Sequence, residues 1–134
     1  MHRILGIDYG EKRVGLALSD PMHMIASPYK TIPNNPDLIV AIQSIMKAEI
    51  VEIVVVGLPK GMKGQETAQT KHVTSFVENL NQNDIKVELV DERLTSISAK
   101  KALVEQGIKT GHNKGLIDQT AAAIILQQYL DSQQ

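Results

Sequence analysis

The sequence predicts an α/β fold in which a mixed five-stranded sheet carries helices on both faces. In its first third, three short apolar segments are separated by turn-forming residues, a pattern typical of an antiparallel meander. From residue 35 onward, segments with helical spacing alternate with apolar segments, which is typical of βαβ units. We therefore expect an antiparallel meander of three strands followed by parallel strands.

The strands are expected at residues 3–7, 14–19, 27–32, 51–56 and 86–90. The first two flank the polar turn DYGEKR and form a hairpin. The fourth, VEIVVV, is mostly β-branched, which indicates a strand buried on both faces. The loop GLPKGMKG follows it at the edge where α/β sheets commonly bind ligands. This loop does not match the nucleotide-binding P-loop pattern.

Four helices are expected between and after these strands. The first has Asn35 as its N-cap and Pro36 in its first turn. The second spans about 65–80 and buries a stripe that includes Val73 and Phe76. The third is capped by Thr95 or Ser96 and ends at Gly107. The last spans 115–130, and one of its faces carries Ile117, Ala121, Ile124 and Gln128.

The composition limits the classes of function. With 134 residues, 43% of them hydrophobic, the chain is expected to form a single domain over 1–134. The absence of cysteine excludes disulfides and Cys-ligated zinc and fits a cytoplasmic location, and no apolar run predicts a membrane span. The net charge of −1 and the 3% aromatic content are unlike those of a dedicated nucleic-acid module. Any polyanionic partner must therefore be bound locally or through metal.

Acidic residues occur at the ends of the first and last expected strands and in the closing helix. Asp8 ends the first strand, Asp91 and Glu92 end the last, and Asp118 lies in the first turn of the helix. If the first and last strands are neighbours, their carboxylates meet, and the helix can bring the third. Because clustered acids repel one another, cations are needed, and oxygen ligands suit Mg²⁺ or Mn²⁺. Two such ions about 4 Å apart are a standard device for phosphodiester hydrolysis.

Each acid also has a simpler interpretation. Asp8 could form a turn with Gly10, Asp118 could complement the helix dipole, and the Asp91–Glu92 pair could be a solvated strand end. Strand alternation places Asp91 and Glu92 on opposite faces, so one of them should face the metals. We favour Glu92, with Asp91 as its substitute.

Small residues in the closing helix fit the same interpretation. Ala121 and Ala122 follow Asp118 by three and four positions. Such small side chains would let the helix approach the sheet closely enough for the Asp118 carboxylate to reach the ions.

Several basic residues are candidates for binding the substrate backbone. They are Lys12, Arg13, Lys60, Arg93 and Lys114. The two arginines are the strongest candidates, because a planar guanidinium can bind a phosphate through two hydrogen bonds. Arg13 could equally pair with a local acid and stabilise the hairpin.

Four motifs resemble those of one bacterial family. They are DYGEKRVG at 8–15, VVGLPKGMKG at 55–64, VDERLTS at 90–96 and IDQTAAAIILQ at 117–127. In this order they resemble the YqgF/RuvX family of Holliday junction resolvases, which has a ribonuclease H-like fold. The family is also assigned to processing the 5′ end of pre-16S ribosomal RNA. The resemblance implies that Asp8, Glu92 and Asp118 are the metal-binding catalytic acids.

The chain departs from the family at one point. Its members often carry a dense basic cluster before the final Asp, whereas this sequence reads KTGHNKGLID, with Lys109 and Lys114 as its lysines. The expected activity is a Mg²⁺- or Mn²⁺-dependent nuclease that uses two ions, with Asp8 bridging them. Structured RNA or branched DNA is its expected partner.

Two other functions and two oligomeric states stay open. A nucleotide-binding domain of the actin and sugar-kinase type would need a second domain of similar size. A non-catalytic ribosome-assembly or nucleic-acid-binding module could retain the same fold. A junction resolvase would act as a homodimer, whereas an RNA-processing enzyme could act as a monomer.

Overall fold

The computed structural model describes residues 1–93 and 114–134. Its strands are β1 Arg3–Tyr9, β2 Arg13–Ser19, β3 Ala26–Pro33, β4 Val51–Leu58 and β5 Lys86–Asp91. Its helices are α1 Leu38–Glu49, α2 Ala68–Gln82 and α4 Lys114–Ser132. The helix expected to end at Gly107 lies outside the described residues.

The five strands form one mixed sheet in the order β3-β2-β1-β4-β5. β2 pairs antiparallel with both β1 and β3, whereas β4 pairs parallel with both β1 and β5. The expected antiparallel meander followed by parallel strands is therefore confirmed. The expectation that the first and last strands are neighbours is wrong, because β4 lies between them. The apolar β4 takes the central position beside β1, and β5 then adds to the outer edge of β4.

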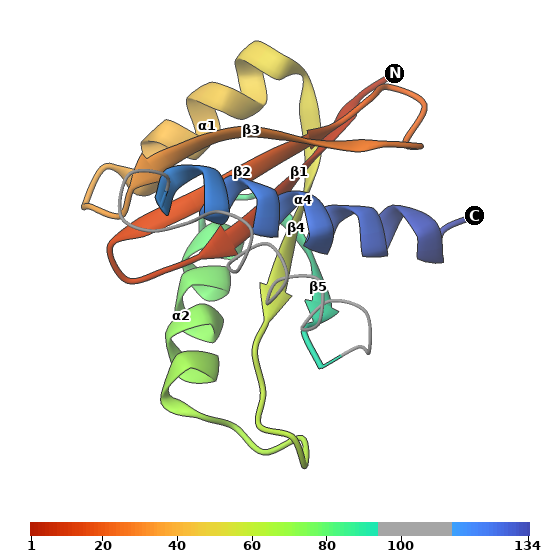
Figure 1. Cartoon of the computed structure of the whole chain (residues 1–134). Helices are drawn as coiled ribbons and strands as arrows, with labels where there is room; N and C mark the ends of the chain where they lie inside the picture. Colours follow the sequence, from red (N-terminus) through yellow and green to blue (C-terminus); the bar gives the residue numbers. More distant parts are fainter. Residues whose placement is uncertain (94–113) are drawn as a thin grey trace.

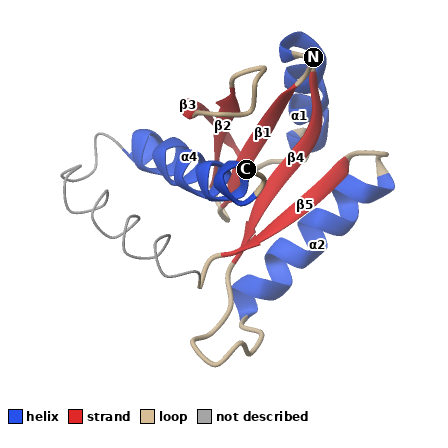
Figure 2. Cartoon of the chain, turned by 90° about the vertical axis from the view of Figure 1, so that its right-hand side faces the viewer, coloured by secondary structure: helices blue, strands red, loops and turns tan. Residues whose placement is uncertain are grey.

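Helices cover both faces of the sheet, as expected. Figure 2 shows α4 on one side of the sheet and α1 and α2 on the other. The core beneath α1 and α2 includes Leu5, Ile42 and Phe76, and the core beneath α4 includes Val55 and Leu126. Figure 1 shows α4 crossing the strands at an angle, so that one helix contacts several strands.

Three glycines allow α4 to approach the sheet closely. Gly6 lies on β1, Gly15 on β2 and Gly57 on β4, within strands that are otherwise apolar. A Cβ atom on Gly6 would lie 2.7 Å from the Cβ of Leu126, and one on Gly15 would overlap the backbone oxygen of Asp118. Because no side chain separates them, the backbone of α4 rests almost directly on β2.

Small residues on α4 complete this contact. Ala121 and Ala122 are both buried, which confirms that small residues at these positions face the sheet. The other residues of the expected face, Ile117, Ile124 and Gln128, are half-buried. The large side chains of α4 that are fully buried are Ile125, Leu126 and Leu130.

Two helices begin later than expected, α1 by two residues and α2 by about three. The side chain of Asn35 accepts a hydrogen bond from the backbone nitrogen of Asp37 at 3.0 Å, which stabilises a turn before α1 begins at Leu38. In α2 the N-cap is Thr67, whose side chain accepts a hydrogen bond from the backbone nitrogen of Thr70. A turn-forming side chain before α1 and a capping side chain at α2 thus set boundaries that helical periodicity alone does not reveal.

Replacing Gly15 with Ala should destabilise the fold, because the new methyl group would overlap the backbone of α4 at Asp118. We expect Gly15→Ala to lower the free energy of unfolding by about 1 to 3 kcal/mol, the usual cost of overpacking. Urea denaturation followed by circular dichroism measures this change.

Gly115→Ala is the matched control. A Cβ atom on Gly115 would lie 3.6 Å from Thr31, which is an ordinary contact. Because Ala favours helix, this variant should be neutral or more stable by up to about 1 kcal/mol. Equal stability of Gly15→Ala and the wild type would contradict the close packing of α4.

Candidate active site

Asp8 projects from β1 toward the face that α4 covers. It pairs with Gly15 in the antiparallel register, and directly paired residues share a face of the sheet. Since Gly15 faces α4, so does the half-buried side chain of Asp8. Asp8 lies inside the strand, before the turn at residues 10–12.

Glu92 reaches the same face from the end of β5. Its backbone nitrogen donates a hydrogen bond to the carbonyl of Leu58 at 3.1 Å, which extends the pairing of β5 with β4. A Cβ atom on Gly57 would lie 3.0 Å from Oε2 of Glu92 and 2.7 Å from Cδ1 of Ile125. The Glu92 carboxylate therefore lies over β4 in the space that Gly57 leaves open. The intervening strand thus does not keep Glu92 away from the face that carries Asp8.

Asp118 is placed by the contact between α4 and β2. Its backbone lies against Gly15, which is the register partner of Asp8. It is the fifth residue of α4, beyond the first turn, so the interpretation of Asp118 as a partner of the helix dipole is wrong. The Asp118 side chain is 21% exposed, and its Oδ2 accepts a hydrogen bond from Nε of Arg13 at 2.6 Å.

The three acids therefore share one region without forming a closed metal cluster. Asp8 and Asp118 are both adjacent to Gly15. Glu92 lies over Gly57, and Gly57 follows Val56, which pairs with Ile7 of β1. Within residues 1–93 and 114–134, no group of three or more acidic, His or Cys side chains is placed to hold a metal ion.

Asp91 is bound by Arg93. The guanidinium of Arg93 donates to both carboxylate oxygens of Asp91, with a shortest distance of 2.7 Å, and the Arg93 backbone nitrogen donates to Oδ1 at 2.9 Å. These hydrogen bonds lower the pKa of Asp91 below its ordinary value and raise that of Arg93. Arg93 also packs against Gly64, whose φ of +83° favours glycine. The planar fork of Arg93 thus binds Asp91 while lying beside Gly64 of the β4–α2 loop.

The other predicted basic residues are distributed around the same end of the sheet. Lys12 is exposed in the β1–β2 turn, and its carbonyl accepts a hydrogen bond from the backbone of Asn34. Lys60 is half-buried in the β4–α2 loop and contributes to lowering the pKa of Asp91. Lys114 is the first residue of α4. Arg13 differs from these lysines because it forms an ion pair with a candidate catalytic acid.

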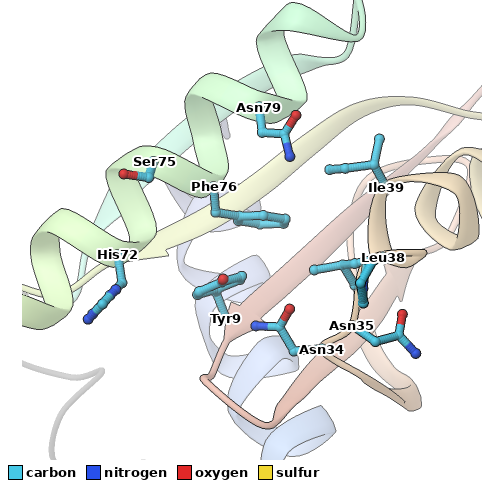
Figure 3. Close-up of a pocket in the computed structure, with 10 residues that line it drawn as sticks. Tyr9, Asn34, Asn35, Leu38, Ile39, His72, Ser75, Phe76 and Asn79 are labelled. Carbon is cyan, nitrogen blue, oxygen red and sulfur yellow. The ribbon is translucent and has the colours of Figure 1, made fainter.

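A cavity of about 300 Å³ lies on the opposite face of the sheet, between α1 and α2. Figure 3 shows Phe76 and Asn79 pointing from α2 toward Leu38 and Ile39 of α1. Tyr9 also lines the cavity, and its ring stacks on Phe76 with centroids 4.3 Å apart. Because Tyr9 follows Asp8 in β1, the two side chains point to opposite faces. The cavity is therefore separate from the acidic site.

Sequence reasoning missed two features of the acidic site. It treated Gly57 as part of a loop, although this residue makes room for Glu92. It also paired Arg13 with a phosphate or a local acid, although its partner is Asp118. The signal for Gly57 was present, since a glycine within an apolar strand often marks the close approach of another group.

The described helices include none that is long and apolar enough to cross a bilayer.

Comparison with known proteins gives matches over nearly the whole chain. A relative from Bacteroides fragilis, named as a candidate pre-16S rRNA nuclease, is 42% identical over 136 residues and 98% of each chain. A relative from Acetivibrio thermocellus with the same name is 42% identical over 97% of this chain and 96% of its own.

Solved structures confirm the fold at much lower identity. Thermus thermophilus RuvC in complex with a Holliday junction substrate superposes with a TM-score of 0.59 at 13% identity, over 99% of this chain and 96% of that one. The fowlpox virus resolvase with Holliday junction DNA gives 0.58 at 12% identity, over 98% of each chain. The expected ribonuclease H-like architecture is therefore confirmed. The family description "RuvX: Holliday junction resolvase" matches residues 2–132, and the chain belongs to this family.

Proposed function

We propose that this protein is a divalent-metal-dependent nuclease that hydrolyses phosphodiester bonds in structured RNA, at the 5′ end of precursor 16S ribosomal RNA. The observation that carries the proposal is the gathering of Asp8, Glu92 and Asp118 on one face of the sheet, from segments far apart in the chain. The names of the relatives at 42% identity support the choice of substrate. Ribosomal RNA processing would place the protein in the cytoplasm.

The donor chemistry of the site fits a hard divalent cation. Asp8, Glu92 and Asp118 offer carboxylate oxygens, the ligands that Mg²⁺ and Mn²⁺ prefer. The guanidinium of Arg13 already rests on Asp118, so a positive charge is accommodated at this position. Asp8, Glu92 and Asp118 would hold the ions, whose chemistry would be to activate the attacking water and stabilise the departing oxygen.

The basic residues of the chain position the substrate backbone. Lys12 is exposed at the tip of the β1–β2 hairpin, Lys60 lies in the β4–α2 loop, and Lys114 starts α4. These positions surround the end of the sheet where the carboxylates lie. Arg93 acts differently, because it is bonded to Asp91, whereas the Glu92 carboxylate lies over Gly57 and would face the substrate. With a net charge of −1 on the chain, backbone binding depends on these local charges and on the ions.

Resolution of Holliday junctions is the second candidate, and the description of the family favours it. A junction presents two strands for symmetric cleavage, so this activity would need a homodimer with two sites. A monomer suffices for one cut in RNA.

A cleavage panel tests both candidates. Wild type and Asp8→Asn are incubated with precursor 16S RNA, four-way junction DNA and linear duplex, with Mg²⁺, with Mn²⁺ or with EDTA. We expect metal-dependent cleavage of the RNA. Asp8→Asn should lower kcat/KM by more than about 100-fold, because loss of a direct ligand should cost more than the 10- to 100-fold loss seen for the groups that orient ligands. Cleavage of the junction alone would select the second candidate.

Other results would reject a nuclease. Nucleic-acid binding without cleavage on any substrate would favour a non-catalytic assembly module. Tight ATP binding without cleavage would favour a nucleotide-binding domain.

Glu92→Gln and Asp91→Asn together test which neighbouring acid serves the site. Because the Glu92 carboxylate faces α4 and Asp91 is bound by Arg93, Glu92→Gln should weaken Mn²⁺ binding by more than about 10-fold. Asp91→Asn should leave Mn²⁺ affinity within about 2-fold of wild type, since an exposed ion pair contributes little. Isothermal titration calorimetry measures both affinities, and the reverse pattern would exchange the two roles.

A further inference from the structure

We propose that Arg13 is an internal counter-ion that occupies Asp118 until the metal binds and is then released to contact a phosphate of the substrate. The inference rests on the proposed function, since it assumes that Asp118 is a metal ligand. It assigns one residue two successive partners, and it makes substrate contact by Arg13 depend on the metal.

Arg13 and Asp118 form a short ion pair between two elements. Arg13 begins β2 and Asp118 lies on α4, and their side chains meet through Nε and Oδ2 at 2.6 Å. Such a short bond between charged groups is among the stronger hydrogen bonds in proteins. It uses the same carboxylate that would have to bind a metal ion beside Asp8. The pair and the metal therefore compete for Asp118.

Arg13 is the more exposed partner of this ion pair. The Arg13 side chain is 40% exposed, whereas that of Asp118 is 21% exposed. The guanidinium therefore lies on the outer side of the pair, where a substrate would approach. A guanidinium carries five donors and the bond to Asp118 uses Nε, so its terminal nitrogens can bind a phosphate.

A bound divalent ion would replace Arg13 in balancing the charge of Asp118. A divalent ion at the carboxylates would repel the guanidinium and compensate Asp118 in its place. Asp118 would then have a cation beside it in both states, so it would never be partly buried without compensation. The displaced guanidinium would find its new partner in the phosphate, whose geometry matches its planar fork.

A purely structural ion pair is the competing explanation. In that case Arg13 fastens the start of α4 to β2, and removing it would disturb Asp118 and weaken metal binding. The counter-ion model gives the opposite sign, because removing a competitor strengthens metal binding.

The direct test measures Mn²⁺ affinity by isothermal titration calorimetry on the full chain. Arg13→Gln should bind Mn²⁺ about 3- to 10-fold more tightly than wild type, the range expected for losing a charged hydrogen bond that is partly exposed. Arg13→Lys should also bind more tightly, by a smaller factor, because the ammonium keeps the charge without the Nε bond. Circular dichroism confirms that the variants fold, and Arg13→Lys carries the test if Arg13→Gln does not.

Lys12→Gln is the matched control. Lys12 is the neighbouring residue in the same hairpin, carries the same charge and is exposed. Its removal should change Mn²⁺ affinity by less than about 2-fold, because a solvated charge is strongly screened. An equal gain in Lys12→Gln and Arg13→Gln would show a general charge effect and would overturn the proposal.

A second readout follows the release of Arg13. Fluorescence anisotropy of labelled RNA is read with and without Mn²⁺, before cleavage begins. The Mn²⁺-dependent gain in affinity should be smaller in Arg13→Gln than in wild type. Lys12→Gln should lose affinity equally in both conditions, since its charge is exposed in both.

The outcomes separate this inference from the proposed function. Unchanged or weaker Mn²⁺ binding by Arg13→Gln would overturn the counter-ion role and leave a structural pair. Wild-type Mn²⁺ affinity in Asp118→Asn would instead show that Asp118 is not a ligand, and the proposed site itself would fail.

Discussion

The close contact between α4 and the sheet is the constraint on which the site depends. Gly15 lets the backbone of α4 touch β2 at Asp118, and Gly57 leaves space for the Glu92 carboxylate over β4. A side chain at either position would separate the acids or push the helix outward. Gly15 and Gly57, which interrupt apolar strands, therefore bring together the three distant segments that carry Asp8, Glu92 and Asp118.

Sequence patterns predicted the elements of the fold but not their full arrangement. The strands were recognisable because β-branched runs and turn residues are local signals. Which strand lies beside β1 depends on how βαβ units pack. No local pattern predicts that β4 lies between β1, which carries Asp8, and β5. The starts of α1 and α2 were missed because capping and turn side chains, at Asn35 and Thr67, moved the boundaries.

The candidate acids could be found because each lies at a distinctive point, a strand end or an early position in the last helix. Their environments could not be found in the same way. The pairing of Arg13 with Asp118 joins residues separated by 105 positions, and it exists because Gly15 brings α4 down onto β2. Arg93 binds Asp91 through a local bond two residues away, a partner that was within reach of sequence reasoning.

Arg93 and Arg13 each bind an acid near the same end of the sheet, but in different ways. Arg93 binds Asp91 through its side chain and its backbone nitrogen on the same short turn, so the pair is held by local geometry that substrate binding need not disturb. Arg13 binds Asp118 through one bond between separate elements, and under the proposed function that carboxylate would also bind the metal. Because a strand and a helix can keep their packing while one side chain turns away, exchange of partners at Arg13 need not disturb the fold. Arg93 is instead bonded to Asp91 by both its side chain and its backbone, so of the two arginines Arg13 is the one suited to change partners.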